Sequence, residues 1–244
     1  MLFHLKSKKI KPDFSVLHTD IHSHLLPGID DGAPDMRTSL QLIRGMIGLG
    51  FKKLITTPHI MRDIYPNTKE NILNKLSQLK LEIKEEGLDV EIHAAAEYFL
   101  DENVEELLRK KEPLLTISGN MVLVEFSMAN PFFGLKTILF DMQMQGYTPV
   151  IAHPERYIYL ERNKQFFDEL KNIGCLFQLN ILSLSGHYGK TVFDFAQYLI
   201  RKNYYELIGS DLHNSRHLEA LHDFSLTNDL KKLLDSGRII NSRL

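Results

Sequence analysis

Short apolar runs alternate with amphipathic segments along almost the whole chain, and this alternation limits the fold more than any other feature. Strands are predicted over residues 19–22, 53–57, 90–95, 121–124, 148–152, 176–180 and 206–209. Helices are predicted over residues 35–49, 68–86, 101–110, 135–145, 162–173, 191–202 and 227–234. Seven strand–helix repeats without a linker predict one α/β domain built as a single parallel barrel. An open doubly wound sheet is the alternative, but the Gly-rich phosphate fingerprint of that fold does not follow the first predicted strand.

Length, charge and cysteine usage restrict the possible functions. The 244 residues suit one α/β barrel. A formal net charge of −2 argues against a protein that binds nucleic acid through a broad basic surface. The only cysteine is Cys175, and position 181, where a cysteine phosphatase needs an arginine, holds Ile181. Any phosphatase activity would therefore have to use metal ions.

The N-terminus differs in composition from the rest of the chain. Four lysines lie within the first twelve residues, without an apolar run long enough for a signal peptide or a membrane span. We therefore expect a basic N-terminal extension over residues 1–17, one domain over residues 18–244, no transmembrane segment, and a cytoplasmic protein. A solvated tail is the favoured interpretation of the extension, and contact with a membrane surface or an acidic partner is the alternative.

The segment after the first predicted strand carries the first sign of a metal site. His22 and His24 are two positions apart, so on a strand both imidazoles leave the same face. A Pro-Gly turn follows, and then the adjacent carboxylates Asp30 and Asp31. Histidines and carboxylates that converge in this way suit a divalent metal ion, although an isolated H-x-H pair is often a surface accident.

Six of the seven predicted strands end at a histidine or a carboxylate. The residues at or just beyond these ends are His22, His24, Asp31, His59, Glu97, Glu125, His153, Asp211 and His213. Singly, each has a structural explanation: His59 could cap a helix, Glu97 could be a solvated loop acid, and His153 could bond a backbone carbonyl. Jointly they are expected on one rim of a barrel, where active sites form, and they predict a multinuclear metal site.

The ordered motifs resemble a known superfamily over about residues 19–217. They read Asp20-Ile21-His22-Ser23-His24, Asp30-Asp31-Gly32, Thr57-Pro58-His59, Ala96-Glu97-Tyr98, His153-Pro154-Glu155-Arg156-Tyr157 and Ser210-Asp211-Leu212-His213-Asn214. This set is similar to that of the polymerase-and-histidinol-phosphatase (PHP) superfamily, and within it to the bacterial tyrosine-protein phosphatases of the capsular and exopolysaccharide type. The resemblance implies a distorted (β/α)7 TIM-like barrel and a site for three metal ions held by the nine residues above. Manganese is the metal it implies, with iron, cobalt or zinc as alternatives.

The chemistry of a phosphatase assigns roles to two arginines. Water held between two cations is acidic enough to supply hydroxide for attack on phosphorus. Arg156 and Arg216 are the predicted catalytic residues, because a guanidinium can bind phosphoryl oxygens through two donors. The alternative for Arg156 is a salt bridge to Glu155 or Glu161. Four ring-bearing loop residues could form the wall of a pocket for an aromatic substrate, or equally a packing or oligomer contact: Phe132, Phe133, His187 and Tyr188.

Three functions remain open from the sequence. The first is a manganese-dependent protein-tyrosine phosphatase that acts on a tyrosine-phosphorylated protein, by resemblance a bacterial tyrosine autokinase of capsule or exopolysaccharide export. The second keeps the site but acts on a small molecule such as histidinol phosphate, or on a phosphodiester. The third is a metal-binding interaction module without activity. No nucleic-acid partner is expected, and the sequence leaves a homo-oligomer open.

Overall fold

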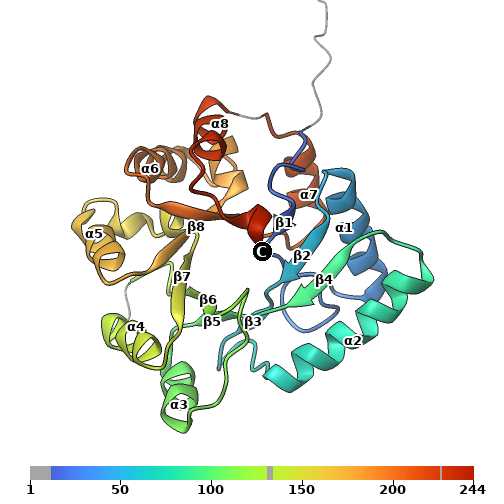
Figure 1. The fold of residues 1–244 in the computed structure, drawn as a ribbon, viewed down its shortest axis with the longest axis horizontal. Helices are drawn as coiled ribbons and strands as arrows, with labels where there is room; N and C mark the ends of the chain where they lie inside the picture. The colour runs from blue at the N-terminus through green and yellow to red at the C-terminus, as the bar shows by residue number, and fades with distance from the viewer. Residues whose placement is uncertain (1–11, 131–133, 226) are drawn as a thin grey trace, which may run out of the picture.

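The computed structural model describes residues 12–130, 134–225 and 227–244 (Figure 1). The strands are β1 (Thr19–Asp20), β2 (Lys53–Thr56), β3 (His59–Ile60), β4 (Glu91–Ala94), β5 (Glu97–Phe99), β6 (Met121–Glu125), β7 (Thr148–Ala152), β8 (Leu176–Asn180) and β9 (Tyr205–Gly209). The α-helices are α1 (Met36–Gly48), α2 (Lys69–Glu85), α3 (Glu102–Lys110), α4 (Leu135–Met144), α5 (Gln165–Asn172), α6 (Lys190–Arg201), α7 (Ser215–His222) and α8 (Asn228–Asp235). The 3-10 turns are η1 (Pro154–Arg156), η2 (Ile158–Leu160), η3 (Ile181–Ser185) and η4 (Asn241–Arg243).

The strands form two parallel sheets. One has the order β1-β2-β4, and the other has the order β3-β5-β6-β7-β8-β9. The second sheet includes two short strands that were not predicted: β3 follows β2 after Thr57-Pro58, and β5 follows β4 after Ala95-Ala96. Figure 1 shows the strands toward the centre and the helices around them. The predicted α/β fold with parallel strands is confirmed, but the pairing does not form one continuous closed sheet.

The two ends of the strand series lie side by side. Beyond β1 and β9, Ser23 and Leu212 form a parallel bridge. The Asp211 N–H donates to the His22 carbonyl over 2.7 Å, and the His24 N–H donates to the Leu212 carbonyl over 2.9 Å. The segment after the first strand is thereby hydrogen-bonded to the segment after the last one.

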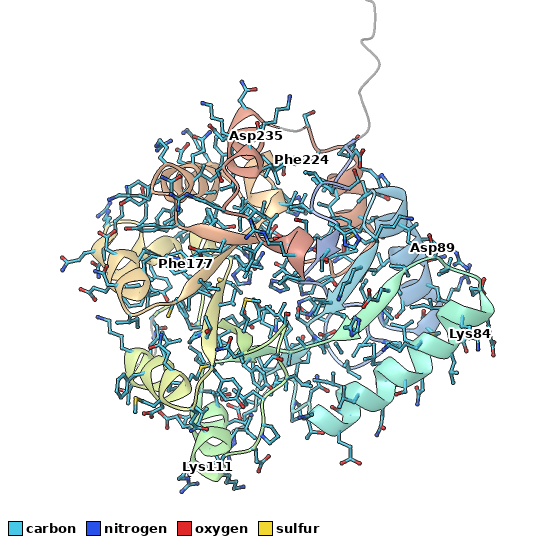
Figure 2. The ribbon with its side chains drawn as sticks, in the orientation of Figure 1. Lys84, Asp89, Lys111, Phe177, Phe224 and Asp235 are labelled. Carbon is cyan, nitrogen blue, oxygen red and sulfur yellow. The ribbon has the colours of Figure 1, made fainter. Side chains whose placement is uncertain are left out.

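The main apolar core fills the space between the sheets and the helices (Figure 2). Phe177 on β8 is fully buried and meets Phe167 of α5 edge-on, with ring centroids 6.1 Å apart. Phe14, which falls in the predicted extension, is also buried and stacks on Phe51 with centroids 5.7 Å apart. The packed body therefore includes Phe14, whereas residues 1–11 lie outside the described residues.

The structure differs from the sequence prediction in several places. The first strand ends at Asp20 rather than His22, and His22 lies in the following segment. Helix α7 was not predicted, because its eight residues are mostly polar and bury only Leu221. Within the described ranges, no helix has the length and hydropathy needed to cross a lipid bilayer.

Helix α2 begins with a reciprocal capping box. The Asn71 N–H donates to Thr68 Oγ1 over 3.3 Å, and the Thr68 N–H donates to Asn71 Oδ1 over 2.8 Å. Because Thr68→Ala removes one of these bonds, we expect it to lower the free energy of unfolding by about 1 kcal/mol, measured by urea denaturation. Thr68→Ser keeps the hydroxyl and should stay near the wild-type value. Equal stability of all three proteins would contradict this role of the cap.

Candidate metal centre

The side chains of the nine predicted metal-site residues lie in one cluster. Four groups of histidine and carboxylate residues, each with ligand atoms within 4.8 Å of one another, make up this cluster. They are His22–His24–Asp211, His22–Glu97–His153, His59–Glu97–Glu125 and His24–Asp31–His59–His213. Each group shares a residue with another, so the cluster is continuous.

Glu97 occupies the buried middle of the cluster. Its Oε2 lies 3.2 Å from His22 Nε2 and 3.2 Å from His59 Nδ1, and its Oε1 lies 3.2 Å from His153 Nε2. Glu125 approaches His59 Nδ1 through Oε1 at 3.0 Å. One carboxylate at the start of β5 therefore connects histidines from three separate segments.

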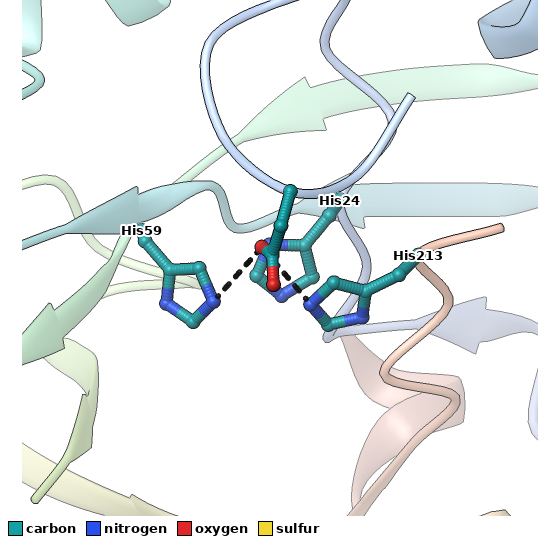
Figure 3. A group of neighbouring side chains, drawn as sticks. His24, His59 and His213 are labelled. Atoms are coloured by element: carbon teal, nitrogen blue, oxygen red, sulfur yellow. Dashed lines mark ion pairs between the residues drawn. The ribbon is translucent and has the colours of Figure 1, made fainter. Parts of the chain in front are cut away.

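The outer part of the cluster is shown in Figure 3, where the imidazoles of His24, His59 and His213 lie around one point. Asp31 Oδ1 lies 3.4 Å from His59 Nε2 and 3.5 Å from His213 Nε2. The rings of His24 and His213 stack with centroids 3.8 Å apart. The Asp31 side chain is half exposed, so this part of the cluster is open to solvent.

Two of the nine residues have unusual backbone conformations. His153 has φ 33° and Asp211 has φ 52°, in the left-handed region that L-residues seldom adopt. His153 directly follows β7, Asp211 is the second residue after β9, and both side chains belong to the cluster. Strain of this kind is typical of functional sites and persists where the surrounding structure imposes it.

Hydrogen bonds orient the two histidines of the first segment. Gln178 Nε2 donates to the Leu179 carbonyl over 2.7 Å, which directs Gln178 Oε1 toward His22 Nδ1 at 2.9 Å. An amide oxygen only accepts, so His22 Nδ1 donates to it and Nε2 faces the cluster. Asp30 Oδ2 lies 2.8 Å from His24 Nδ1 and directs that ring in the same way.

The sequence analysis assigned no role to Gln178 and Asp30. Gln178 lies on β8, which corresponds to the one predicted strand that does not end at a histidine or carboxylate. A polar residue within an otherwise apolar strand was the available signal. Asp30 stands beside Asp31 in the quoted motif, and only the structure distinguishes the carboxylate that orients a ring from the one in the cluster.

The histidines and carboxylates of the cluster shift one another's pKa values. Burial alone would lower the pKa of His22, but the charges of Glu97 and Asp211 outweigh it and raise this pKa to about 9. Burial alone would raise the pKa of Glu97, but the neighbouring histidines hold it well below its usual value. The carboxylates therefore need positive charge beside them, which protons or bound cations can supply.

Several buried atoms of the cluster lack a hydrogen bond of acceptable geometry. They are His59 Nδ1, Glu97 Oε1, Glu125 Oε1 and His153 Nδ1. Some of them lie within ion-pair distance, such as His59 Nδ1 and Glu125 Oε1 at 3.0 Å, but the directions are not those of a hydrogen bond. Buried polar atoms rarely lack a hydrogen-bond partner in a folded protein. Imidazole nitrogens and carboxylate oxygens are also donor atoms that suit transition-metal ions, so bound metal could satisfy them. The donor set thus fits the divalent metals predicted from the sequence.

The two predicted catalytic arginines differ in their placement. Arg156 Nη1 donates to Asp211 Oδ2 over 2.7 Å, so its carboxylate partner is neither Glu155 nor Glu161. Arg216 is exposed at the start of α7, and its side chain takes part in no ion pair within the described ranges. Of the predicted pocket wall, Tyr188 lies against Arg156, whereas Phe132 and Phe133 lie outside the described residues.

Comparison with known proteins identifies the family. The model of the family described as "Capsular polysaccharide synthesis, CpsB/CapC" matches residues 18–221, which include all nine residues of the cluster. The chain belongs to the CpsB/CapC family. The sequence resemblance to capsule-type tyrosine phosphatases is thereby confirmed.

Relatives within the CpsB/CapC family are similar over most of their length. The tyrosine-protein phosphatase YwqE of Bacillus subtilis is 31% identical over 80% of this chain and 77% of its own. The tyrosine-protein phosphatase CpsB of Streptococcus pneumoniae is 32% identical over 80% of this chain and 82% of its own. A solved structure from work on these two proteins, described there as metal-dependent tyrosine phosphatases, matches with a TM-score of 0.77 and 29% identity. It covers 90% of this chain and 87% of that one.

Proposed function

We propose that this CpsB/CapC protein is a metal-dependent protein-tyrosine phosphatase. The observation that carries this proposal is the single cluster of nine histidine and carboxylate side chains with the Arg156 guanidinium at its edge. Relatives named tyrosine-protein phosphatases support it. The reaction is hydrolysis of the phosphate ester of a tyrosine side chain on a partner protein.

The nine clustered residues are the proposed metal ligands. Four overlapping donor groups support a site for more than one ion, and we propose three, with Mn²⁺ as the metal. When bound, such ions would activate water as the nucleophile and neutralise the charge of the phosphoryl group. The protein's own contribution is to hold the donors in place, with His22 and His24 fixed by Gln178 and Asp30.

Arg156 is the proposed phosphoryl-binding residue. Its side chain is 26% exposed, and within the described ranges its guanidinium makes one hydrogen bond, to Asp211. A guanidinium has five N–H donors, so the others remain for phosphoryl oxygens at the open side of the cluster. The leaving group is a phenolate, whose conjugate acid has a pKa of about 10, and it departs with little protonation. Arg216, which has no ion-pair partner among the described residues and lies three residues after His213, is proposed as a second cation at the site.

The remaining features of the proposal concern fold, partner and location. We propose that residues 18–244 form one PHP-type domain, a distorted (β/α)7 barrel interrupted at Thr57-Pro58 and Ala95-Ala96, against which Phe14 of the preceding segment packs. The parallel bridge between Ser23 and Leu212 supports closure between the first and last strands. The proposed partner is a bacterial tyrosine autokinase of capsule or exopolysaccharide export, and the proposed location is the cytoplasm.

Substrate preference in the presence and absence of metal tests the proposed function. Chelator-stripped protein is assayed with a phosphotyrosine peptide and with histidinol phosphate, before and after addition of Mn²⁺. We expect phosphate release from the peptide alone, and only after Mn²⁺ is added. Release from histidinol phosphate alone would assign the site to a small-molecule phosphatase. Absence of release from both, despite bound Mn²⁺, would contradict a phosphatase.

Gln178 offers a test of the proposed ligands from outside the cluster. Gln178→Leu removes the acceptor that fixes the tautomer of His22, and we expect Mn²⁺ affinity to fall about 10- to 100-fold. Competition with a chelator of known affinity measures this change. The matched control is Gln197→Leu, which removes an amide that bonds Asp229 between α6 and α8. Unchanged Mn²⁺ affinity in Gln178→Leu would exclude this role of the amide.

A further inference from the structure

We propose that Tyr188 is a positioning residue that holds the Arg156 guanidinium in its phosphoryl-binding orientation. Tyr188 then strengthens the binding of any phosphate group, with or without an aromatic ring, and does not need to contact the ring of the substrate. This inference rests on the proposed function, because it concerns how that site binds the phosphoryl group. It also replaces the expectation that Tyr188 is part of a wall around the substrate ring.

The Tyr188 ring lies directly against the arginine. Arg156 Cζ is 4.6 Å from the ring centroid, which is the geometry of a cation–π contact. Tyr188 is partly exposed, and its ring covers one face of the Arg156 guanidinium. A flexible arginine side chain covered in this way loses fewer conformations when it binds a ligand.

Asn180 connects Tyr188 to the same carboxylate that Arg156 bonds. Asn180 Oδ1 accepts from the Leu182 N–H over 2.9 Å, which fixes the orientation of the amide. Its Nδ2 then donates to Tyr188 Oη over 3.2 Å and to Asp211 Oδ2 over 2.9 Å. Arg156 donates to the same Asp211 oxygen. The Asn180 amide therefore links the Tyr188 hydroxyl to the carboxylate that binds the Arg156 guanidinium.

The buried carboxylate of Glu155 connects the segments that carry this network. Glu155 is fully buried next to Arg156, and its Oε1 accepts from the Asn180 N–H over 2.9 Å and from Ser183 Oγ over 2.7 Å. Its Oε2 accepts from Tyr205 Oη over 2.8 Å. Glu155 thus links η1, which carries Arg156, to the end of β8 and to η3, which leads to Tyr188.

The test compares a ligand that has no ring with one that has a ring. Binding of inorganic phosphate to the Mn²⁺-loaded protein is measured by calorimetry, and kcat and KM are measured with a phosphotyrosine peptide. We expect Tyr188→Leu to weaken phosphate binding about tenfold, because the π face is lost. Tyr188→Phe keeps the face and should restore most of the affinity. Bound Mn²⁺ per chain should be equal in all three proteins.

A second comparison shows whether Tyr188 acts through Arg156. In an Arg156→Ala background, Tyr188→Leu should have no further effect on phosphate binding, since coupled residues are not additive. The matched control is Tyr198→Leu on α6, which also removes a ring beneath a cation, Lys164, whose Nζ is 4.3 Å from the centroid. This control should bind phosphate as the wild type does. Tyr188→Met takes the place of Tyr188→Leu if the leucine variant does not fold.

Three results would overturn the inference. One is wild-type phosphate affinity in Tyr188→Leu together with a raised KM for the peptide, as expected for a wall residue. The second is an equal loss of affinity with and without Arg156. The third is no phosphate binding by the loaded wild-type protein. Failure to hydrolyse the peptide, with phosphate binding changed as expected, would instead contradict the proposed function alone.

Discussion

Replacement of Glu97 by glutamine is expected to have the largest effect on activity of any single change considered. The substitution keeps the size of the side chain but removes a charge that lies within 3.5 Å of nitrogen atoms of His22, His24, His59 and His153. Loss of a partner outside the coordination sphere already costs about 10- to 100-fold, so we expect loss of this proposed shared ligand to lower kcat/KM by more than 100-fold. Bound Mn²⁺ per chain, measured by elemental analysis after dialysis, should fall in parallel.

The matched control is Glu91→Gln on β4. Glu91 is also paired with a histidine, His93, but both side chains are about half exposed on the surface. This variant should keep wild-type activity and metal content. Wild-type metal content and activity in Glu97→Gln would show that the carboxylate is structural and would contradict the proposed ligand set.

Replacement of Arg156 by alanine is expected to lower kcat by about 10²- to 10³-fold, the effect of removing one donor that stabilises charge in a transition state. The variant also removes the charge-assisted hydrogen bond from Arg156 to Asp211 Oδ2, but this oxygen still accepts the hydrogen bond from the Asn180 amide. We therefore expect bound Mn²⁺ to decrease less than activity does. Steady-state kinetics with the phosphotyrosine peptide and elemental analysis of the same sample measure both quantities.

Two further variants separate binding of phosphate from support of Asp211. Arg156→Lys keeps a positive donor for Asp211 but lacks the planar pair of donors, so it should restore metal content and little of the lost kcat. Arg44→Ala removes an exposed arginine that pairs with Glu86 at 2.6 Å, and it should leave both quantities unchanged. Full activity in Arg156→Lys would argue against a role that depends on the guanidinium shape.

Strands and helices with strong local patterns were predicted well. The strands at Thr148–Ala152 and Leu176–Asn180 have the predicted bounds, because each is a compact run that is almost wholly buried. The short strands β3 and β5, which follow the predicted strand ends at Thr57 and Ala95, were missed, since they depend on which neighbouring strand each segment pairs with. Local sequence does not contain that information.

Membership of the cluster could be predicted, but the support around it could not. The nine clustered residues have side chains that bind metals and stand at recurring places in the strand–helix pattern. Gln178 and Asn180 carry no such chemical signal, and Asp30 has the same side chain as its neighbour Asp31; the roles of all three come from the face and direction that the folded backbone gives them. The partner of Arg156 was missed for the same reason, because Asp211 lies 55 residues further along the chain.

The pairing between the segments after β1 and β9 has a consequence for synthesis of the protein. His22 and His24 leave the ribosome early, whereas Asp211 and His213, which complete two of the donor groups, come almost 190 residues later. A nascent or prematurely terminated chain therefore carries histidines without the residues that complete these groups. Since domains form as units during translation, the full donor set can assemble only when nearly the whole polypeptide has been made. Truncated products would be inactive rather than partly active.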